Sequence, residues 1–267
     1  MKQRPSFPAR LDAGKTQAAP KTLLGATRVV TPQSPARAKP VALTSPTGVG
    51  LESSTIRARM VKKLADQGIE DVAVLEAMGR VERHRFVDSA LVNQAYEDTS
   101  LPIGLGQTIS KPNVVARMIA LLREAPSLKG EAMMGRVLEI GTGCGYQAAV
   151  LSCMAREVYS IERLRGLHDK ARENLRPLRL ANVHLIFGDG MLGYAQGAPY
   201  SAIISAAGGE HVPQAWVDQL AMGGRLVAPT HTASGQQALV VIDKSPQGLQ
   251  QTLLEAVNFV PLKSGIA

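Results

Sequence analysis

The fold is decided by one short stretch of the chain, residues 137–146, whose sequence is VLEIGTGCGY. A short apolar segment with strand-forming character is followed by Gly141, Gly143 and Gly145, and then by residues suited to a helix. Glycine lets the backbone turn tightly and approach a ligand closely, and the helix start adds free N–H donors. This strand, glycine turn and helix therefore predict a nucleotide-binding unit of an α/β fold.

The spacing of the glycines indicates which ligand the turn holds. A dinucleotide site has the pattern G-x-G-x-x-G, which needs its third glycine at position 146, where this chain has Tyr146. The observed G-x-G-x-G, with Glu139 before it, is the pattern of S-adenosylmethionine sites. We therefore predict S-adenosylmethionine as the cofactor, held by Glu139, Gly141, Gly143 and Gly145, and we exclude a dehydrogenase.

Two further acidic residues follow the next two expected strands. Glu162 comes directly after the strand expected at 157–161, and Asp189 lies between two glycines after the strand expected at 183–187. The carboxyl ends of parallel strands meet at one edge of a sheet, where ligands bind. We expect Glu162 to accept hydrogen bonds from the ribose hydroxyls, and Asp189, beside Gly188, to accept one from the adenine amino group. Taken singly, such an acid is more often a helix cap or a solvated charge.

Strands and helices alternate outward from this unit, which predicts a Rossmann-like, doubly wound and mostly parallel sheet. Helical periodicity within 52–80 predicts an N-terminal helical cap, which can cover the carboxyl ends of the strands. The expected strands are 137–140, 157–161, 183–187, 202–206, 225–229, 238–242 and a segment ending at Phe259-Val260. The expected helices after the glycine turn are 145–155, 164–175 and about 213–221.

The stretch 96–111, YEDTSLPIGLGQTISK, has a different character. It is rich in Gly, Pro, Thr and Ser and lacks a long period, so we expect an ordered loop there. Pro112 follows it and is placed to begin a helix.

Taken together, these motifs resemble the protein-L-isoaspartate (D-aspartate) O-methyltransferase family of class I S-adenosylmethionine-dependent methyltransferases. The resemblance covers about 52–262 and is carried by RHRFV (83–87), LPIG (101–104), GQTIS (106–110), LEIGTG (138–143), GYQAAVL (145–151), VYSIER (158–163), GDG (188–190), GGRLV (223–227) and FVPL (259–262). Two departures touch the acceptor side: Lys111 stands where the family usually has Gln, and Asn258 where it often has Arg. The order of the last strands stays open.

The resemblance implies methylation of the free α-carboxylate of L-isoaspartyl residues in damaged proteins and peptides, which starts repair through a succinimide. A carboxylate is already ionised at pH 7, so the reaction needs no general base. We expect Ser110 to act as the catalytic residue by donating a hydrogen bond to that carboxylate, with Thr108 and Ile109 lining the cofactor side of the loop. The alternative role of Ser110 is a helix N-cap ahead of Pro112.

The net charge of +8 is distributed unevenly along the 267 residues. Residues 1–50 hold eight basic residues and one acid, a net +7, which leaves +1 for the rest. We expect 1–50 to be a disordered, Pro- and Ala-rich basic arm, because such a composition buries too little apolar surface, and 51–267 to be the methyltransferase domain. The alternative is an RNA methyltransferase that uses the arm, but a nearly neutral domain with only 4% aromatic residues in the chain does not favour nucleic acid.

The rest of the composition indicates which partners and which cellular compartment to expect. The chain has no run of 18 apolar residues, and its two cysteines lack a metal-ligand spacing, so we expect neither a membrane span nor a metal. Free thiols fit a reducing compartment, which favours a cytoplasmic location. We expect a monomer whose partners are isoaspartyl-containing proteins and peptides.

Overall fold

The computed structural model of the chain describes residues 54–267. The basic arm expected at 1–50 therefore lies outside the described residues. The helices are α1 (Ser54–Asp66), α2 (Val72–Arg80), α3 (Pro112–Arg123), α4 (Tyr146–Ser152), α5 (Arg165–Leu175) and α6 (Gln214–Gln219). The strands are β1 (Leu101–Gly104), β2 (Gln107–Ile109), β3 (Met134–Ile140), β4 (Ala155–Glu162), β5 (Val183–Phe187), β6 (Tyr200–Ser205), β7 (Leu220–His231), β8 (Gln237–Ser245) and β9 (Gly248–Ala256).

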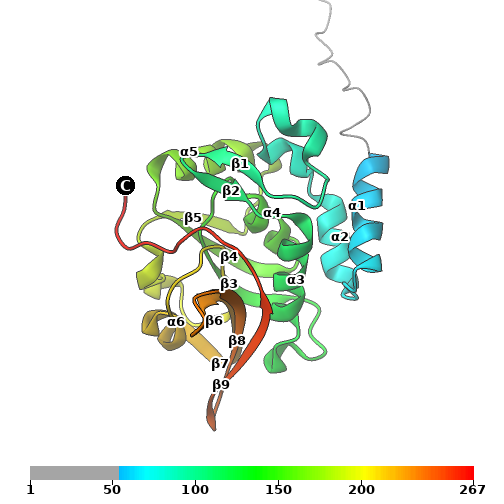
Figure 1. Cartoon of the computed structure of the whole chain (residues 1–267). Coiled ribbons are helices and arrows are strands. Elements are labelled where there is room, and N and C mark those ends of the chain that lie inside the picture. Colours follow the sequence, from blue (N-terminus) through cyan, green and yellow to red (C-terminus); the bar gives the residue numbers. More distant parts are fainter. Residues whose placement is uncertain (1–53) are drawn as a thin grey trace, which may run out of the picture. The chain divides into compact units, whose positions relative to one another are not determined.

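Seven strands form one twisted sheet in the order β5-β4-β3-β6-β7-β8-β9 (Figure 1). The pairs from β5 to β7 are parallel, whereas β7–β8 and β8–β9 are antiparallel. The doubly wound, mostly parallel sheet predicted from the sequence is confirmed. The order of the last strands is also settled, because β7, β8 and β9 lie side by side in chain order.

Both faces of the sheet are covered, so the carboxyl halves of β3 and β6 are buried. Val137 and Leu138, successive residues of β3, are both fully buried but belong to two different hydrophobic clusters. The larger cluster contains apolar residues of α1 to α5, and the smaller one contains Trp216 of α6. This alternation at consecutive positions is what places the carboxyl end of β3, and the glycine turn after it, between two packed layers.

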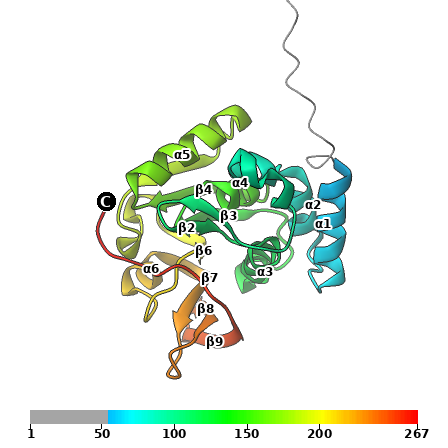
Figure 2. The ribbon, with the colours of Figure 1, turned by 45° about the horizontal axis from the view of Figure 1, so that its top comes forward.

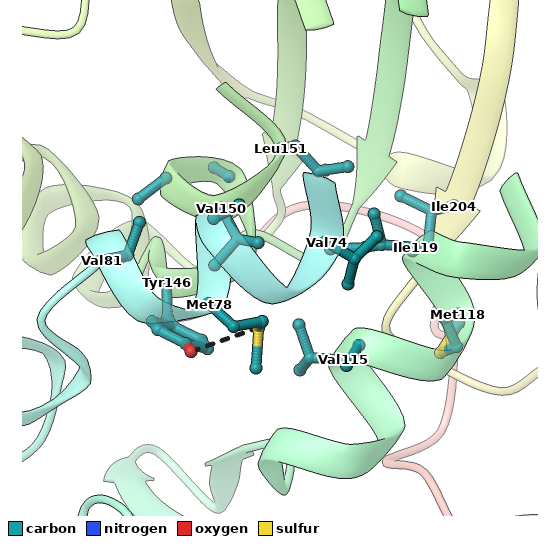
Figure 3. Packing of buried hydrophobic residues seen from close by; sticks show 14 of the residues in the cluster. Val74, Met78, Val81, Val115, Met118, Ile119, Tyr146, Val150, Leu151 and Ile204 are labelled. Atoms are coloured by element: carbon teal, nitrogen blue, oxygen red, sulfur yellow. Dashed lines mark hydrogen bonds between the residues drawn. The ribbon is translucent and has the colours of Figure 1, made fainter. Parts of the chain in front are cut away.

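The two N-terminal helices pack on the helical layer beside the sheet (Figure 1). Asp71 caps α2 by accepting a hydrogen bond from the Val74 N–H at 3.1 Å. Figure 3 shows Met78 of α2 between α3 and α4, where the hydroxyl of Tyr146 donates to its sulfur at 3.6 Å. The cap exists as predicted, but no residue of α1 or α2 lines the cavity at the strand ends. These helices pack against α3 and α4 instead.

A buried arginine joins this layer to the chain that follows it. Arg83 is fully buried, its Nε donates to the carbonyl of Ala95 at 2.7 Å, and its guanidinium carbon lies 4.8 Å from the centre of the Tyr146 ring. Burial lowers the pKa of Arg83, and the tyrosine partly offsets that effect. The side chain thereby holds the segment before β1 against the first residue of α4.

Three expected elements differ from the structure. The loop expected at 96–111 contains an antiparallel hairpin, β1–β2, in which Leu101 pairs with Ile109. The helix expected at 145–155 ends at Ser152, and Ala155 already belongs to β4. The last strand, expected to end at Phe259-Val260, is β9, which ends at Ala256.

Candidate active site

The β1–β2 hairpin covers the carboxyl ends of the central strands. Figure 2 shows it in front of β3 and β4. A Cβ placed on Gly143 would lie 3.1 Å from the Ile103 side chain, so hairpin and glycine turn are in close contact. At the tip, Leu105 has a φ of 52°, a left-handed conformation that costs a leucine about 1–2 kcal/mol. Its side chain reaches the start of α5, where it lies against Gly166.

The glycine turn is fixed by the acid that follows β4. Glu162 is buried, and its Oε2 accepts a hydrogen bond from the Gly143 N–H at 2.9 Å. Its Oε1 accepts from the Leu164 N–H at 2.9 Å. Gly141, Gly143 and Gly145 all have positive φ values, which a residue with a Cβ rarely adopts. The carboxylate keeps further acceptor positions on each oxygen for a ligand.

Glu139 lies beneath the turn, in a buried polar chain. The Ser160 hydroxyl donates to its Oε2, and Thr142 Oγ1 lies 2.6 Å from the Ser160 oxygen. The Oε1 atom of Glu139 has no hydrogen-bond partner among the described residues. Burial, which is complete, raises the pKa of Glu139 to about 8, and the Glu162 charge acts in the same direction. The chain Thr142–Ser160–Glu139 thus supports the glycine turn from below.

Asp189 is held by two backbone N–H groups. Its Oδ1 accepts from Met191 at 2.9 Å, as the cap of a short 3₁₀ helix, and its Oδ2 accepts from Gly265 at 2.6 Å. Gly265 belongs to the tail after β9, which runs back to the start of α5, where the Ala267 carbonyl accepts from the Arg165 N–H (Figure 1). Asp189 therefore anchors the tail beside the site.

These elements enclose a cavity of about 270 Å³, close to the usual size of small-molecule sites. Its walls come from the hairpin, the glycine turn, the end of β4, the turn after β5, the turn after β6 and the tail. The lining residues include Ile103, Leu105, 107–110, 140–144, Gln147, 161–164, Gly190, Ala206, Ala207 and 260–263.

The cavity gathers most of the predicted site residues but not all of them. The predicted residues that line it are Thr108, Ile109, Ser110, Gly141, Gly143 and Glu162. The predicted residues outside the lining are Glu139, Gly145, Gly188 and Asp189. Gly145 starts α4, and a Cβ there would lie 3.0 Å from Leu175, so this glycine permits close packing of α4 on α5.

Sequence reasoning missed several parts of the wall, and it gave Gly190 only as a neighbour of Asp189. Gln147 sits one residue into the first turn of α4, and its buried Nε2 has no partner in the described part of the chain. Gly190 lies against β3, where a Cβ would come within 2.6 Å of Ile140. Ala206-Ala207 and the tail residues 260–263 meet because Gly208 exchanges backbone hydrogen bonds with Val260 and Leu262. Small and apolar residues carry no motif, so only the topology reveals these last two segments.

The donor and acceptor set fits S-adenosylmethionine. The Glu162 carboxylate and the Gln147 amide line the cavity and could bind polar groups of the cofactor, and the Gly141 and Gly143 backbone can be approached because no Cβ intervenes. The walls of Ile103, Leu164 and their neighbours supply the apolar surface that an adenosyl group requires.

Other classes of site find less support. Among residues 54–267 no group of three or more His, Cys, Asp or Glu side chains is arranged to hold a metal ion. None of the helices described there is both long enough and apolar enough to cross a bilayer. Cys144 is buried beside the cavity, and burial raises the pKa of its thiol to about 11, so it stays a neutral thiol at neutral pH.

Comparison with known proteins agrees with this geometry. Residues 55–267 match the sequence model of the family described as protein-L-isoaspartate(D-aspartate) O-methyltransferase. A protein-L-isoaspartate O-methyltransferase of Methylibium petroleiphilum is 57% identical over 266 residues, which cover 98% of this chain and 96% of that protein. The enzyme of the same name from Leptothrix cholodnii is 63% identical over 220 residues, covering 82% of this chain and 77% of that protein.

Solved structures show the same relationship. A protein-L-isoaspartate O-methyltransferase superposes with a TM-score of 0.70 at 28% identity, covering 79% of this chain and 67% of that one. A Plasmodium falciparum protein described as a protein-L-isoaspartate O-methyltransferase, crystallised with S-adenosyl-L-homocysteine, superposes with a TM-score of 0.64 at 25% identity, covering 78% and 98%. The chain therefore belongs to the protein-L-isoaspartate (D-aspartate) O-methyltransferase family.

Proposed function

We propose that this chain methylates the free α-carboxylate of L-isoaspartyl residues, and that Ser110 holds that carboxylate in place. One observation carries the role of Ser110. Its half-buried hydroxyl lines the cavity and also a neighbouring groove, and it has no hydrogen-bond partner within residues 54–267. The competing role as a helix cap is not seen, because the residue at the N-cap of α3 is Lys111. The hydroxyl is thus free to donate to an incoming carboxylate.

The main task of the protein in this reaction is to orient the reacting groups. S-Adenosylmethionine supplies a methyl group activated by its sulfonium. The acceptor carboxylate is ionised at neutral pH, so no side chain has to remove a proton. Alignment of the reacting groups in a closed site can lower the barrier by roughly 7–11 kcal/mol. His84 bonds the Tyr96 hydroxyl at 2.7 Å and does not line the cavity, which agrees with a reaction that needs no base.

The cofactor contacts divide into direct and supporting ones. We assign direct contact to Gly141, Gly143 and Glu162, with Thr108 and Ile109 between the cofactor and the acceptor. The residues outside the lining act through these: Glu139 and Gly145 shape the glycine turn, and Gly188 and Asp189 shape the edge nearest the tail. The product methyl ester then loses methanol to form a succinimide, whose hydrolysis returns part of the material to normal aspartate.

A pair of matched peptides tests the proposed function. The purified chain is incubated with S-adenosylmethionine carrying a labelled methyl group and with a peptide containing either L-isoaspartate or L-aspartate at one position. We expect label in a base-labile ester of the isoaspartyl peptide only. Equal labelling of both peptides, or of neither, contradicts the proposal.

The assembly and the compartment are also proposals. We propose a monomer that works in the cytoplasm on isoaspartyl proteins and peptides, without nucleic acid. Both cysteines of the chain, Cys144 and Cys153, are free thiols, which supports a reducing compartment. The net charge of only +1 after residue 50 supports a substrate other than nucleic acid. Light scattering during gel filtration tests the monomer.

A further inference from the structure

A second hollow is also lined by Ser110. It is a groove of about 430 Å³ between the segment that enters α3 and the segment that leaves β9. Its lining residues are Ser100, Ser110, Lys111, Val114, Ala256, Val257, Asn258 and Phe259. Ser110 is the residue that this groove shares with the cofactor cavity. A peptide whose carboxylate is held by Ser110 can therefore place a neighbouring residue in the groove.

The groove has one charged side chain, Lys111. This ammonium makes no hydrogen bond or ion pair with any part of the chain from residue 54 to 267, although the side chain is half-buried. The acids closest in the chain to the groove residues Ser100 and Ala256 are already engaged. Asp98 accepts from the backbone N–H of Asn113, and Glu255 pairs with Arg117 at 3.1 Å. The positive charge of Lys111 is thus left for a ligand.

The backbone holds Lys111 in one conformation. It precedes Pro112, and a residue before proline is confined to extended backbone, as its φ of −60° and ψ of 148° show. A lysine is also a poor choice at a helix N-cap, because a cation there opposes the helix dipole. The stability of the helix therefore does not explain a lysine at this position, whereas a role in binding a ligand in the groove would explain it.

We propose that Lys111 makes the groove a subsite for an acidic side chain next to the isoaspartyl residue of the substrate. Val114, Val257 and Phe259 supply apolar walls for the methylene groups of a glutamate, and the ammonium pairs with its carboxylate. No acid lines the groove, so nothing in it opposes a negative charge. This inference rests on the proposed function, because it assumes that Ser110 holds the isoaspartyl carboxylate.

Matched peptides test the subsite. Isoaspartyl peptides carry Glu, Gln or Lys directly before or directly after the isoaspartate, and initial rates of methylation give kcat and KM for each. The chain is compared with Lys111→Gln, Lys111→Arg and Lys111→Glu. Lys129→Gln serves as the matched control, because Lys129 is exposed and lines neither hollow.

We expect the unaltered chain to prefer Glu over Gln by about 3–10-fold in kcat/KM at one flanking position, mainly through KM, as for a partly screened ion pair. The preference for the Glu peptide should remain in Lys111→Arg and Lys129→Gln. It should be lost in Lys111→Gln, and Lys111→Glu should prefer the Lys peptide instead. Added NaCl weakens it, because salt screens exposed charges.

Two results overturn the inference. One is equal kcat/KM for the Glu and Gln peptides with the unaltered chain, and the other is a preference that survives in Lys111→Gln. Methylation of the Gln peptide distinguishes this failure from that of the proposed function: if the Gln peptide is methylated, only the subsite is wrong. If no isoaspartyl peptide is methylated, both proposals fall.

Discussion

The carboxylate of Glu162 accepts a hydrogen bond from the backbone N–H of Gly143, with 2.9 Å between Oε2 and the nitrogen. This bond joins the end of β4 to the middle of the glycine turn after β3. A second bond, from the Leu164 N–H, fixes the other oxygen. We assign Glu162 to the ribose of the cofactor, and the same side chain also shapes the glycine turn. Cofactor binding and the geometry of the turn therefore depend on one carboxylate.

Replacing Glu162 by Gln should weaken cofactor binding. The amide has one oxygen in place of two and no charge, so either the Gly143 or the Leu164 contact is lost along with a strong acceptor for the ribose. A charge-assisted bond contributes about 1.5–3 kcal/mol, so the Kd for S-adenosylhomocysteine should rise about 10–100-fold. Calorimetric titration measures this. Glu173→Gln, at an exposed position of α5, is the control and should bind normally. An unchanged Kd for Glu162→Gln would remove this residue from the site.

Replacing Ser110 by Ala should impair turnover while sparing the cofactor. Alanine has no hydroxyl group, so the acceptor carboxylate loses the hydrogen bond that orients it. We expect kcat/KM for an isoaspartyl peptide to fall about 10–100-fold, with the Kd for the cofactor unchanged within about twofold. Ser89→Ala, which removes an exposed hydroxyl from a short 3₁₀ helix, should behave like the unaltered chain. Full activity in Ser110→Ala would refute the role given to its hydroxyl.

Replacing Glu139 by Gln should change how stability depends on pH. Burial raises the pKa of Glu139 to about 8, whereas the unfolded chain has the ordinary value of 4.5. Between these values the folded chain binds more protons than the unfolded chain, so the free energy of unfolding falls as pH rises. Gln cannot ionise, so the variant should gain about 1–4 kcal/mol relative to the unaltered chain between pH 5 and pH 8.

Urea unfolding at a series of pH values measures this difference for Glu139→Gln. Glu131→Gln is the control, because Glu131 is exposed. Curves of unfolding free energy against pH that run parallel for Glu139→Gln and the unaltered chain would mean that Glu139 is ionised in the folded state.

Replacing Arg83 by Lys should destabilise the fold. Lysine keeps the charge but has neither the Nε donor that bonds the Ala95 carbonyl nor a flat group to lie over the Tyr146 ring. Leaving buried groups unpaired should cost about 2–4 kcal/mol, measured as a shift in the urea midpoint at unchanged slope. Arg85→Lys, at a half-exposed arginine paired with Glu82, should cost under about 1 kcal/mol. Equal losses in the two variants would argue against the special position of Arg83.

The sequence alone predicted the elements whose apolar runs adjoin glycine or proline residues. The strand expected at 183–187 is β5 at the same residues, and the helix expected at Pro112 begins there. The glycine turn at 141–145 lies between β3 and α4, as its spacing predicts. In each case the local sequence pattern and the tertiary packing favour the same structure.

Elements with weak local signals were not predictable. The hairpin 101–109 contains Gly and Pro, which strands usually avoid, and its pairing depends on the turn at Leu105. Strand β9 is almost wholly exposed, so it lacks the apolar alternation that would have marked it, and the apolar pair 259–260 lies beyond it in the tail. The adenine contact expected for Asp189 stays a prediction, but the bonds of its oxygens to the Met191 and Gly265 N–H groups could not be read from its place in the chain.

The two hydrogen bonds of Asp189 have a consequence for the ageing of the protein itself. Asp189 is followed by Gly190, and an aspartate before glycine isomerises readily because no Cβ shields the nitrogen that attacks its side chain. Ring closure requires the carboxyl group to leave both N–H donors and turn toward the Gly190 nitrogen. The hydrogen bond from tail residue Gly265 thus restrains the Asp189 side chain in a damage-prone dipeptide, within a catalyst whose substrates are the products of that same damage.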